Sequence, residues 1–119
     1  MAVQSSTGDL SLNGVAVARG YSGRGAGKSN PALQTAPSIG PIPQGRYHIG
    51  APFVHPHAGP FAMRLTPQRD TGTFGRSGFM IHADSMSHPG ESSNGCIVLM
   101  PQVRQRIWGS HDHVIVVVP

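Results

Sequence analysis

Short apolar runs separated by glycine and proline dominate this sequence. Among 119 residues there are 16 glycines and 11 prolines, and they follow no repeating period. Both residues interrupt helices and favour tight turns, so the short apolar runs between them predict strands. A chain of this length encloses one hydrophobic core. We therefore expect a single domain over residues 1–119, mainly β, with a compact sandwich or barrel-like arrangement and one short helix.

Alternation and turn residues predict where the strands lie. The run Leu10–Ala18 alternates around Asn13-Gly14, which is a strong hairpin signal. The only helix is expected from Pro101 to Trp108, because Pro101 suits a first turn. Residues 20–45 are expected to form an irregular surface stretch. Further strands are expected at residues 46–50, 61–66, 79–82, 96–100 and 113–118. The last of these is rich in β-branched residues, which predicts burial on both faces.

The charge pattern restricts the partners of the chain. Nine basic against five acidic residues give a net charge of +4, but the basic residues mostly stand singly and aromatic residues make up only 6%. A nucleic-acid interface is therefore not expected; isolated arginines suit single carboxylates better. The longest apolar run, Val114–Val118, is too short to insert into a membrane. No secretory signal peptide is visible, so we expect synthesis in the cytoplasm and export by another route.

The segment from His82 to Cys96 carries the candidate chemistry. Cys96 is the only cysteine; it follows the polar run Ser93-Asn94-Gly95 and heads an apolar strand, while His82 ends another. If the two strands are neighbours, their ends bring imidazole and thiol together, as a cysteine nucleophile requires. The amides of Gly95 and Cys96 would then hold an oxyanion, with Gly95 leaving the backbone open. The alternative is a cysteine that simply packs as a small hydrophobic residue.

Four other side chains near this segment have both a functional and a structural interpretation. Ser93 either orients His82 or stabilises the turn. Arg76 either clamps a substrate carboxylate or is solvated at a strand end. Asp84 supports the loop after His82 or contacts a substrate amine. Tyr21 either lines the groove or packs.

The remaining histidines raise the question of a metal. The spacing in His55-Pro-His57 and His111-Asp-His113 resembles that of paired metal ligands. However, Pro56 breaks the regular strand in the first pair, and no third ligand is evident. We therefore expect no metal and no other cofactor, and keep a zinc-dependent hydrolase as an alternative. His88 is a weaker candidate base than His82, because it lies in a loop between turn residues.

Five short motifs in a fixed order resemble a known family. They resemble the L,D-transpeptidase catalytic domain and, more closely, the compact L,D-transpeptidase-like effectors of type VI secretion, from about Ser6 to Val118. Asn94 stands where the larger family usually has a second histidine. Cys96 follows His82 by 14 residues, which implies a reduced loop over the acyl-donor site and favours hydrolysis. The motifs are Ser6-Thr-Gly-Asp-Leu, Gly20-Tyr-Ser-Gly, Gly40-Pro-Ile-Pro-Gln-Gly, Ile81-His-Ala-Asp and Ser93-Asn-Gly-Cys-Ile.

This resemblance implies a peptidoglycan-modifying cysteine enzyme with Cys96 as nucleophile and His82 as base. The implied substrates are the peptide stems of peptidoglycan, whose terminal D-alanine is released to water or exchanged for another amine. It also implies delivery into the periplasm of a target cell and neutralisation by a cognate immunity protein. A non-catalytic cell-wall-binding β-domain remains the alternative outside enzymology.

Overall fold

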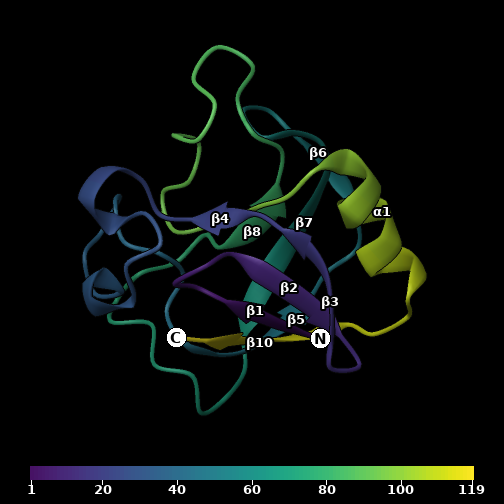
Figure 1. Cartoon of the computed structure of the whole chain (residues 1–119), viewed down its shortest axis with the longest axis horizontal. Helices are drawn as coiled ribbons and strands as arrows, with labels where there is room; N and C mark the ends of the chain where they lie inside the picture. Colours follow the sequence, from purple (N-terminus) through teal and green to yellow (C-terminus); the bar gives the residue numbers. More distant parts are fainter.

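A computed structural model describes all residues, 1–119, and confirms the mainly β class with a single α-helix (Figure 1). Two 3-10 turns, η1 (Gly25–Gly27) and η2 (Pro31–Leu33), lie between the fourth and fifth strands. The other elements, in chain order, are β1 (Ala2–Gln4), β2 (Asp9–Leu12), β3 (Val15–Arg19), β4 (Tyr21–Ser22), β5 (Gly45–Ile49), β6 (Phe53–His55), β7 (Gly59–Pro67), β8 (Met80–His82), β9 (Ile97–Val98), α1 (Pro101–Gly109) and β10 (Val114–Val118).

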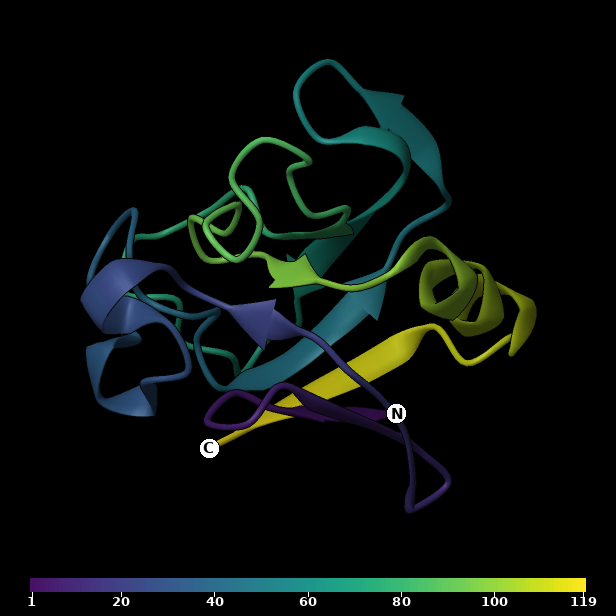
Figure 2. The ribbon, with the colours of Figure 1, turned by 45° about the horizontal axis from the view of Figure 1, so that its top comes forward.

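The strands form one continuous sheet that curls back on itself. Their order is β3-β2-β1-β10-β5-β7-β8-β9-β4, with β6 added on β7. Its first and last members, β3 and β4, are consecutive in the chain and run on as one ribbon across the molecule (Figures 1 and 2). Gly20 joins them, and a Cβ there would meet the carbonyl oxygen of Val98. The sheet is therefore barrel-like, as expected from the sequence.

The predicted hairpin is confirmed. β2 and β3 pair antiparallel, and Asn13 (φ 51°) and Gly14 (φ 80°) both adopt the left-handed conformation at the turn. Two consecutive residues with positive φ match the twist of the flanking strands. The pairing has one register shift, between Leu10 and Ser11.

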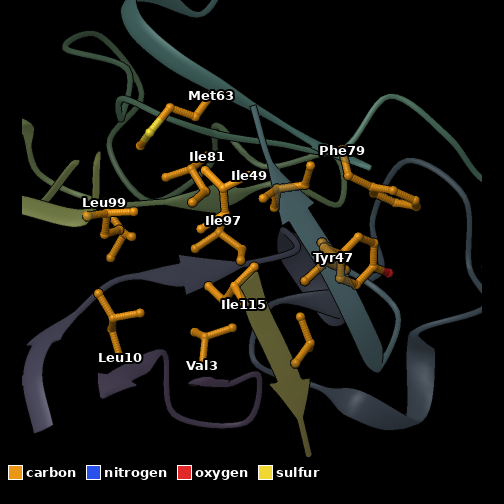
Figure 3. Packing of buried hydrophobic residues seen from close by; sticks show 14 residues of the cluster. Val3, Leu10, Tyr47, Ile49, Met63, Phe79, Ile81, Ile97, Leu99 and Ile115 are labelled. Atoms are coloured by element: carbon orange, nitrogen blue, oxygen red, sulfur yellow. The ribbon is translucent and has the colours of Figure 1, made fainter. Parts of the chain in front are cut away.

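One core of 14 buried hydrophobic residues fills the inside of the curled sheet. Ile81 and Ile97 pair across β8 and β9 and point into it together with Ile49 and Ile115 (Figure 3). Tyr47 is fully buried, and its hydroxyl donates to the carbonyl of Pro43 at 2.7 Å. That bond satisfies the one polar atom that Tyr47 brings into the core.

Two expectations about burial were wrong. Strand β10 is not buried on both faces: Ile115 and Val117 are buried, but Val114 and Val116 are only half-buried and Val118 is exposed. The strand lies in a single sheet, with the core on one side only. Residues 20–45 are not confined to the surface either. The segment Gly40–Pro43 is buried, and the hydroxyl of Ser22 accepts the amide N–H of Ile42 at 2.8 Å.

Helix α1 closes the side of the sheet next to β7, at the right in Figure 1. Ile107 enters the core, and the guanidinium of Arg104 donates to the carbonyls of Pro60 (2.8 Å) and Phe61 (3.2 Å). Trp108 stacks on His113, with ring centroids 4.4 Å apart. No helix in the molecule has the length and apolar character that a membrane crossing requires.

Candidate functional site

Strands β8 and β9 bring His82 and Cys96 to one face of the sheet. The strands are parallel neighbours, with Ile81 opposite Ile97. Since side chains alternate along a strand, Ile81 and Ile97 enter the core, while Met80, His82 and Cys96 face the other way. Accordingly, Cys96 packs with Met80 and Ala62 in a small cluster separate from the main core.

The expected position of Cys96 relative to His82, at adjoining ends of two strands, was wrong in detail. We expected the end of the His82 strand to adjoin the start of the Cys96 strand. Instead the parallel register sets His82 opposite Val98, whereas Cys96 precedes β9 at its other end. His82 and Cys96 are thus diagonal neighbours on one face, and no hydrogen bond joins them. The thiol lies against the carbonyl oxygen of Gly78, 3.7 Å from Sγ.

Both side chains line an open cleft of about 860 Å³. One wall comes from the β6–β7 turn, including His55 and Ala58, and the floor comes from Gly78 and Met80. The other wall is the loop between β8 and β9, which projects at the top of Figure 1. The volume is in the range of ligand-binding clefts. Cys96 is therefore not sealed in the core, although only 8% of its surface is exposed.

The surroundings of Cys96 keep its thiol protonated at rest. Burial raises the pKa of the Cys96 thiol, against the opposing effects of the Met80 amide and the positive charge of Arg76. A buried thiolate without a direct cationic partner is poorly stabilised. The resting site therefore holds a neutral thiol, and the proton must be removed when a substrate is attacked.

His82 has the protonation state that a base requires. Its Nδ1 lies 2.7 Å from the carbonyl oxygen of Ala83. A carbonyl only accepts, so Nδ1 carries the proton of the neutral ring and Nε2 has the free lone pair. Burial, chiefly, lowers the pKa of His82, and the charges of Arg104 and His55 add to this. His82 is therefore neutral near pH 7.

Ser93 stabilises the turn before Cys96 rather than orienting His82. Its fully buried hydroxyl donates to the carbonyl of Cys96 (2.7 Å) and accepts the amides of Gly23 (2.8 Å) and Gly95 (3.3 Å). It has no hydrogen bond to His82. Of the two interpretations of Ser93, the geometry matches the structural one.

Gly95 has a steric reason to be glycine. Its φ is +111°, and a Cβ there would collide with the guanidinium of Arg76. Its amide is engaged by Ser93, but the amide of Cys96 has no hydrogen-bond partner. Only the Cys96 amide is therefore free to receive an oxyanion. Asn94 is exposed at the cleft wall, where its side chain makes no hydrogen bond.

Arg76 is occupied by backbone carbonyls, which argues against the expected substrate clamp. Nη1 donates to Gln34 (2.5 Å) and Pro41 (2.8 Å), and Nη2 donates to Gly40 (2.9 Å) and Asn94 (3.4 Å). These contacts tie the buried 40–43 segment to the turn that carries Cys96. Arg76 thus positions the turn through its planar guanidinium group, whose several N–H donors lysine cannot reproduce.

Substitution Arg76→Lys is expected to destabilise the protein by about 2–4 kcal/mol, because charge-assisted hydrogen bonds to partly buried carbonyls are lost. Urea unfolding measures this, with Arg69→Lys as control, since Arg69 is exposed and its side chain makes no hydrogen bond or salt bridge. Unchanged stability with a raised KM for an anionic substrate would restore the clamp interpretation.

Asp84 and Tyr21 organise the loop that forms one cleft wall. Asp84 Oδ1 accepts the hydroxyls of Tyr21 (2.7 Å) and Ser92 (2.8 Å) and the amide of Ser85 (2.9 Å), and Oδ2 accepts the amide of Gly90 (3.0 Å). Burial acts to raise the pKa of Asp84, but these hydrogen bonds outweigh it and lower the pKa. Of the two interpretations of Asp84, the geometry therefore matches support of the loop.

Tyr21 does not line the cleft. Its hydroxyl donates to Asp84 and accepts the amide of Ser92 at 2.9 Å, while the Lys28 ammonium lies 4.4 Å from its ring centroid. The expected substrate contact of Tyr21 is therefore replaced by a role in holding the loop.

Substitution Asp84→Ala is expected to loosen the loop over residues 85–92, since two hydroxyl groups (Tyr21 and Ser92) and two backbone amides (Ser85 and Gly90) lose their acceptor. Limited proteolysis should then cut the loop faster, with little change in global stability. Asp84→Asn, which keeps one acceptor oxygen, should be intermediate. Equal cleavage rates in wild type and Asp84→Ala would show that the loop does not depend on this carboxylate.

The histidines of the two His-x-His pairs have other surroundings than a shared ligand site. Nδ1 of His55 accepts backbone amides, His57 is exposed, and His113 stacks on Trp108. No group of three or more His, Cys, Asp or Glu side chains is arranged to hold a metal ion. His88 reaches the cleft from the loop, where its Nδ1 contacts the hydroxyl of Ser87 at 3.1 Å.

Sequence reasoning missed three contributors to the site. The carbonyl of Gly78 contacts the thiol, His55 faces the cleft, and Arg104 supports the wall from α1. Gly78 and Arg104 have no signal in the sequence, because they act through the register of β8 and through a helix distant in the chain. His55 was considered only as a metal ligand.

The fold and the site define a small, barrel-like β domain with a cysteine and a histidine on one wall of an open cleft. The chain belongs to the Tlde1 domain family, a family of type VI secretion effectors, whose model matches residues 16–118. No curated protein sequence matches the chain.

Proposed function

We propose that this effector is a cysteine enzyme that cleaves or exchanges the terminal D-alanine of peptidoglycan tetrapeptide stems, as an L,D-carboxypeptidase or L,D-transpeptidase. The observation that carries the proposal is that Cys96 and His82 face one open cleft, with the free lone pair of His82 at Nε2. Membership of an effector family and the motif order around His82 and Cys96 support the substrate class.

The reaction begins with a neutral thiol and a neutral imidazole. The Cys96 thiol turns from the Gly78 carbonyl and gives its proton to Nε2 of His82 as sulfur attacks the carbonyl carbon of the L-centre of the diamino acid. The free amide of Cys96 stabilises the oxyanion. His82 then returns the proton to the nitrogen of D-alanine, the C–N bond breaks, and a thioester remains on Cys96.

The second half of the reaction reverses these proton transfers. Water or an amine gives a proton to His82 and attacks the thioester, and sulfur leaves and is reprotonated. The cleft is open, so water reaches the thioester readily. Hydrolysis is therefore expected to compete strongly with exchange.

We further propose that the protein acts in the periplasm of a target cell, where the stems lie, and that a cognate immunity protein protects the producing cell. Membership of the Tlde1 domain family supports the immunity protein.

The test is mass spectrometry of purified tetrapeptide muropeptides incubated with the wild-type protein. Loss of one D-alanine, or its replacement by an added D-amino acid, supports the proposal and identifies the acceptor. Intact muropeptides at high enzyme concentration would overturn it, and wall binding without turnover would favour a binding domain instead. Loss of turnover on adding a chelator would favour a zinc-dependent hydrolase.

A further inference from the structure

His55, the last residue of β6, is held in one tautomer by the backbone. Its Nδ1 accepts the amide N–H of His57 at 3.1 Å and that of Ala58 at 3.0 Å. Amide groups only donate, so Nδ1 of the neutral ring is unprotonated and the proton is on Nε2. No hydrogen bond within the protein uses that Nε2–H.

His55 thus presents a hydrogen-bond donor to the cleft, and His82 presents an acceptor to the same cleft. Both rings line it. Nε2 of His82 is an acceptor, fixed by Ala83, and Nε2 of His55 is a donor, fixed by His57 and Ala58. Two imidazoles on one cleft, locked in complementary tautomers, suit a ligand that carries an amine and an anion.

The leaving residue of the proposed reaction has these two groups side by side. His82 protonates its nitrogen, so the residue that departs must lie next to His82. In an α-amino acid the carboxylate carbon is two bonds from that nitrogen. A donor on the same cleft as His82 is therefore well situated to meet the carboxylate.

We propose that the Nε2–H of His55 binds the free carboxylate of the residue that leaves. This contact gives a physical reason for the terminal residue of the proposed substrate to carry a free carboxylate rather than continue into a cross-link. The same donor holds the carboxylate of a free amino acid that enters during exchange. This assignment rests on the proposed function.

The test compares a tetrapeptide that ends in D-alanine with the same peptide ending in D-alaninamide. A hydrogen bond to a charged group is expected to give the wild type about a tenfold to hundredfold preference in kcat/KM for the acid. His55→Asn is the informative variant: its Oδ1 can accept the two backbone amides, as in an Asx turn, but it has no donor at the position of Nε2.

His55→Asn should therefore lower kcat/KM for the acid much more than for the amide, so that the preference for the acid is lost. His55→Gln, which carries an N–H near that position, should recover part of the preference. His48→Asn, the same change at an exposed histidine on β5, should keep all of it. The wild-type comparison needs no variant, so equal turnover of acid and amide overturns the assignment even if a variant unfolds.

The outcomes separate this assignment from the proposed function. Equal turnover of acid and amide by the wild type, or an unchanged preference in His55→Asn, overturns the role of His55 alone. If the wild type cleaves neither peptide, the proposed function fails and this assignment fails with it.

Discussion

Cys96→Ala is expected to lower D-alanine release from tetrapeptide stems by about four orders of magnitude or more, because the only nucleophile is removed. The fold should survive. Cys96 packs in a small cluster with Ala62 and Met80, away from the main core, so removal of one sulfur atom is expected to cost only about 1 kcal/mol. Mass spectrometry of the muropeptides measures the first effect, and urea unfolding measures the second.

Cys96→Ser is the matched control, because it keeps the shape of the side chain and a hydroxyl group. A serine hydroxyl is far less acidic than a thiol and a weaker nucleophile, so this variant should also be inactive while remaining as stable as the wild type within about 1 kcal/mol. Activity retained in Cys96→Ala would rule out a covalent role for sulfur. If a chelator also stopped that activity, a metal-dependent reaction would be indicated.

The sequence was sufficient for the hairpin, the helix and most strands. Asn13-Gly14 requires two left-handed residues, and Pro101 begins α1, so local chemistry alone determined these features. Strand burial was harder to predict. The β-branched residues of β10 predict a strand, but they do not tell whether one or both of its faces are buried. Only the sheet order shows that one face lies outside the core.

The candidate site was predictable as a set of residues but not as a geometry. Cys96 and His82 were identified from their polar and apolar neighbours. The parallel pairing of β8 with β9, which makes them diagonal neighbours, depends on a long-range register that no local pattern encodes. Arg76 was misjudged for the same reason, since its four carbonyl partners lie in segments 18 to 42 residues away in the chain.

Several polar side chains around the cleft form hydrogen bonds to the backbone. Ser93, Arg76 and Asp84 each bind main-chain atoms of the segments around Cys96 and His82. Few helices or strands border the cleft, so these hydrogen bonds, rather than strand pairing, hold its loops in place. The Cys96 amide and the Nε2 atoms of His55 and His82 make no hydrogen bond within the protein, and the Cys96 thiol has only a long contact with the Gly78 carbonyl. These are the groups that the proposed reaction uses.

His82→Asn is the second large effect we expect, a loss of about 10²–10⁴-fold in D-alanine release at neutral pH, as removal of a general base typically gives. Asparagine can still donate a hydrogen bond to the carbonyl of Ala83, so the end of β8 should keep its conformation. It offers no basic nitrogen in place of Nε2. Unfolding in urea should therefore change little while turnover falls.

The pH dependence distinguishes a base from a merely structural histidine. Only neutral His82 accepts the thiol proton, and burial lowers its pKa, so wild-type activity should fall as the pH drops through a value below 6.5. In His82→Asn this acid limb should vanish. The residual activity should instead rise with pH as more of the Cys96 thiol ionises, and only at alkaline pH, because burial raises the pKa of that thiol. An acid limb that persists unchanged in His82→Asn would mean that another group accepts the proton, and His88, on the loop that faces the same cleft, would be the next to replace.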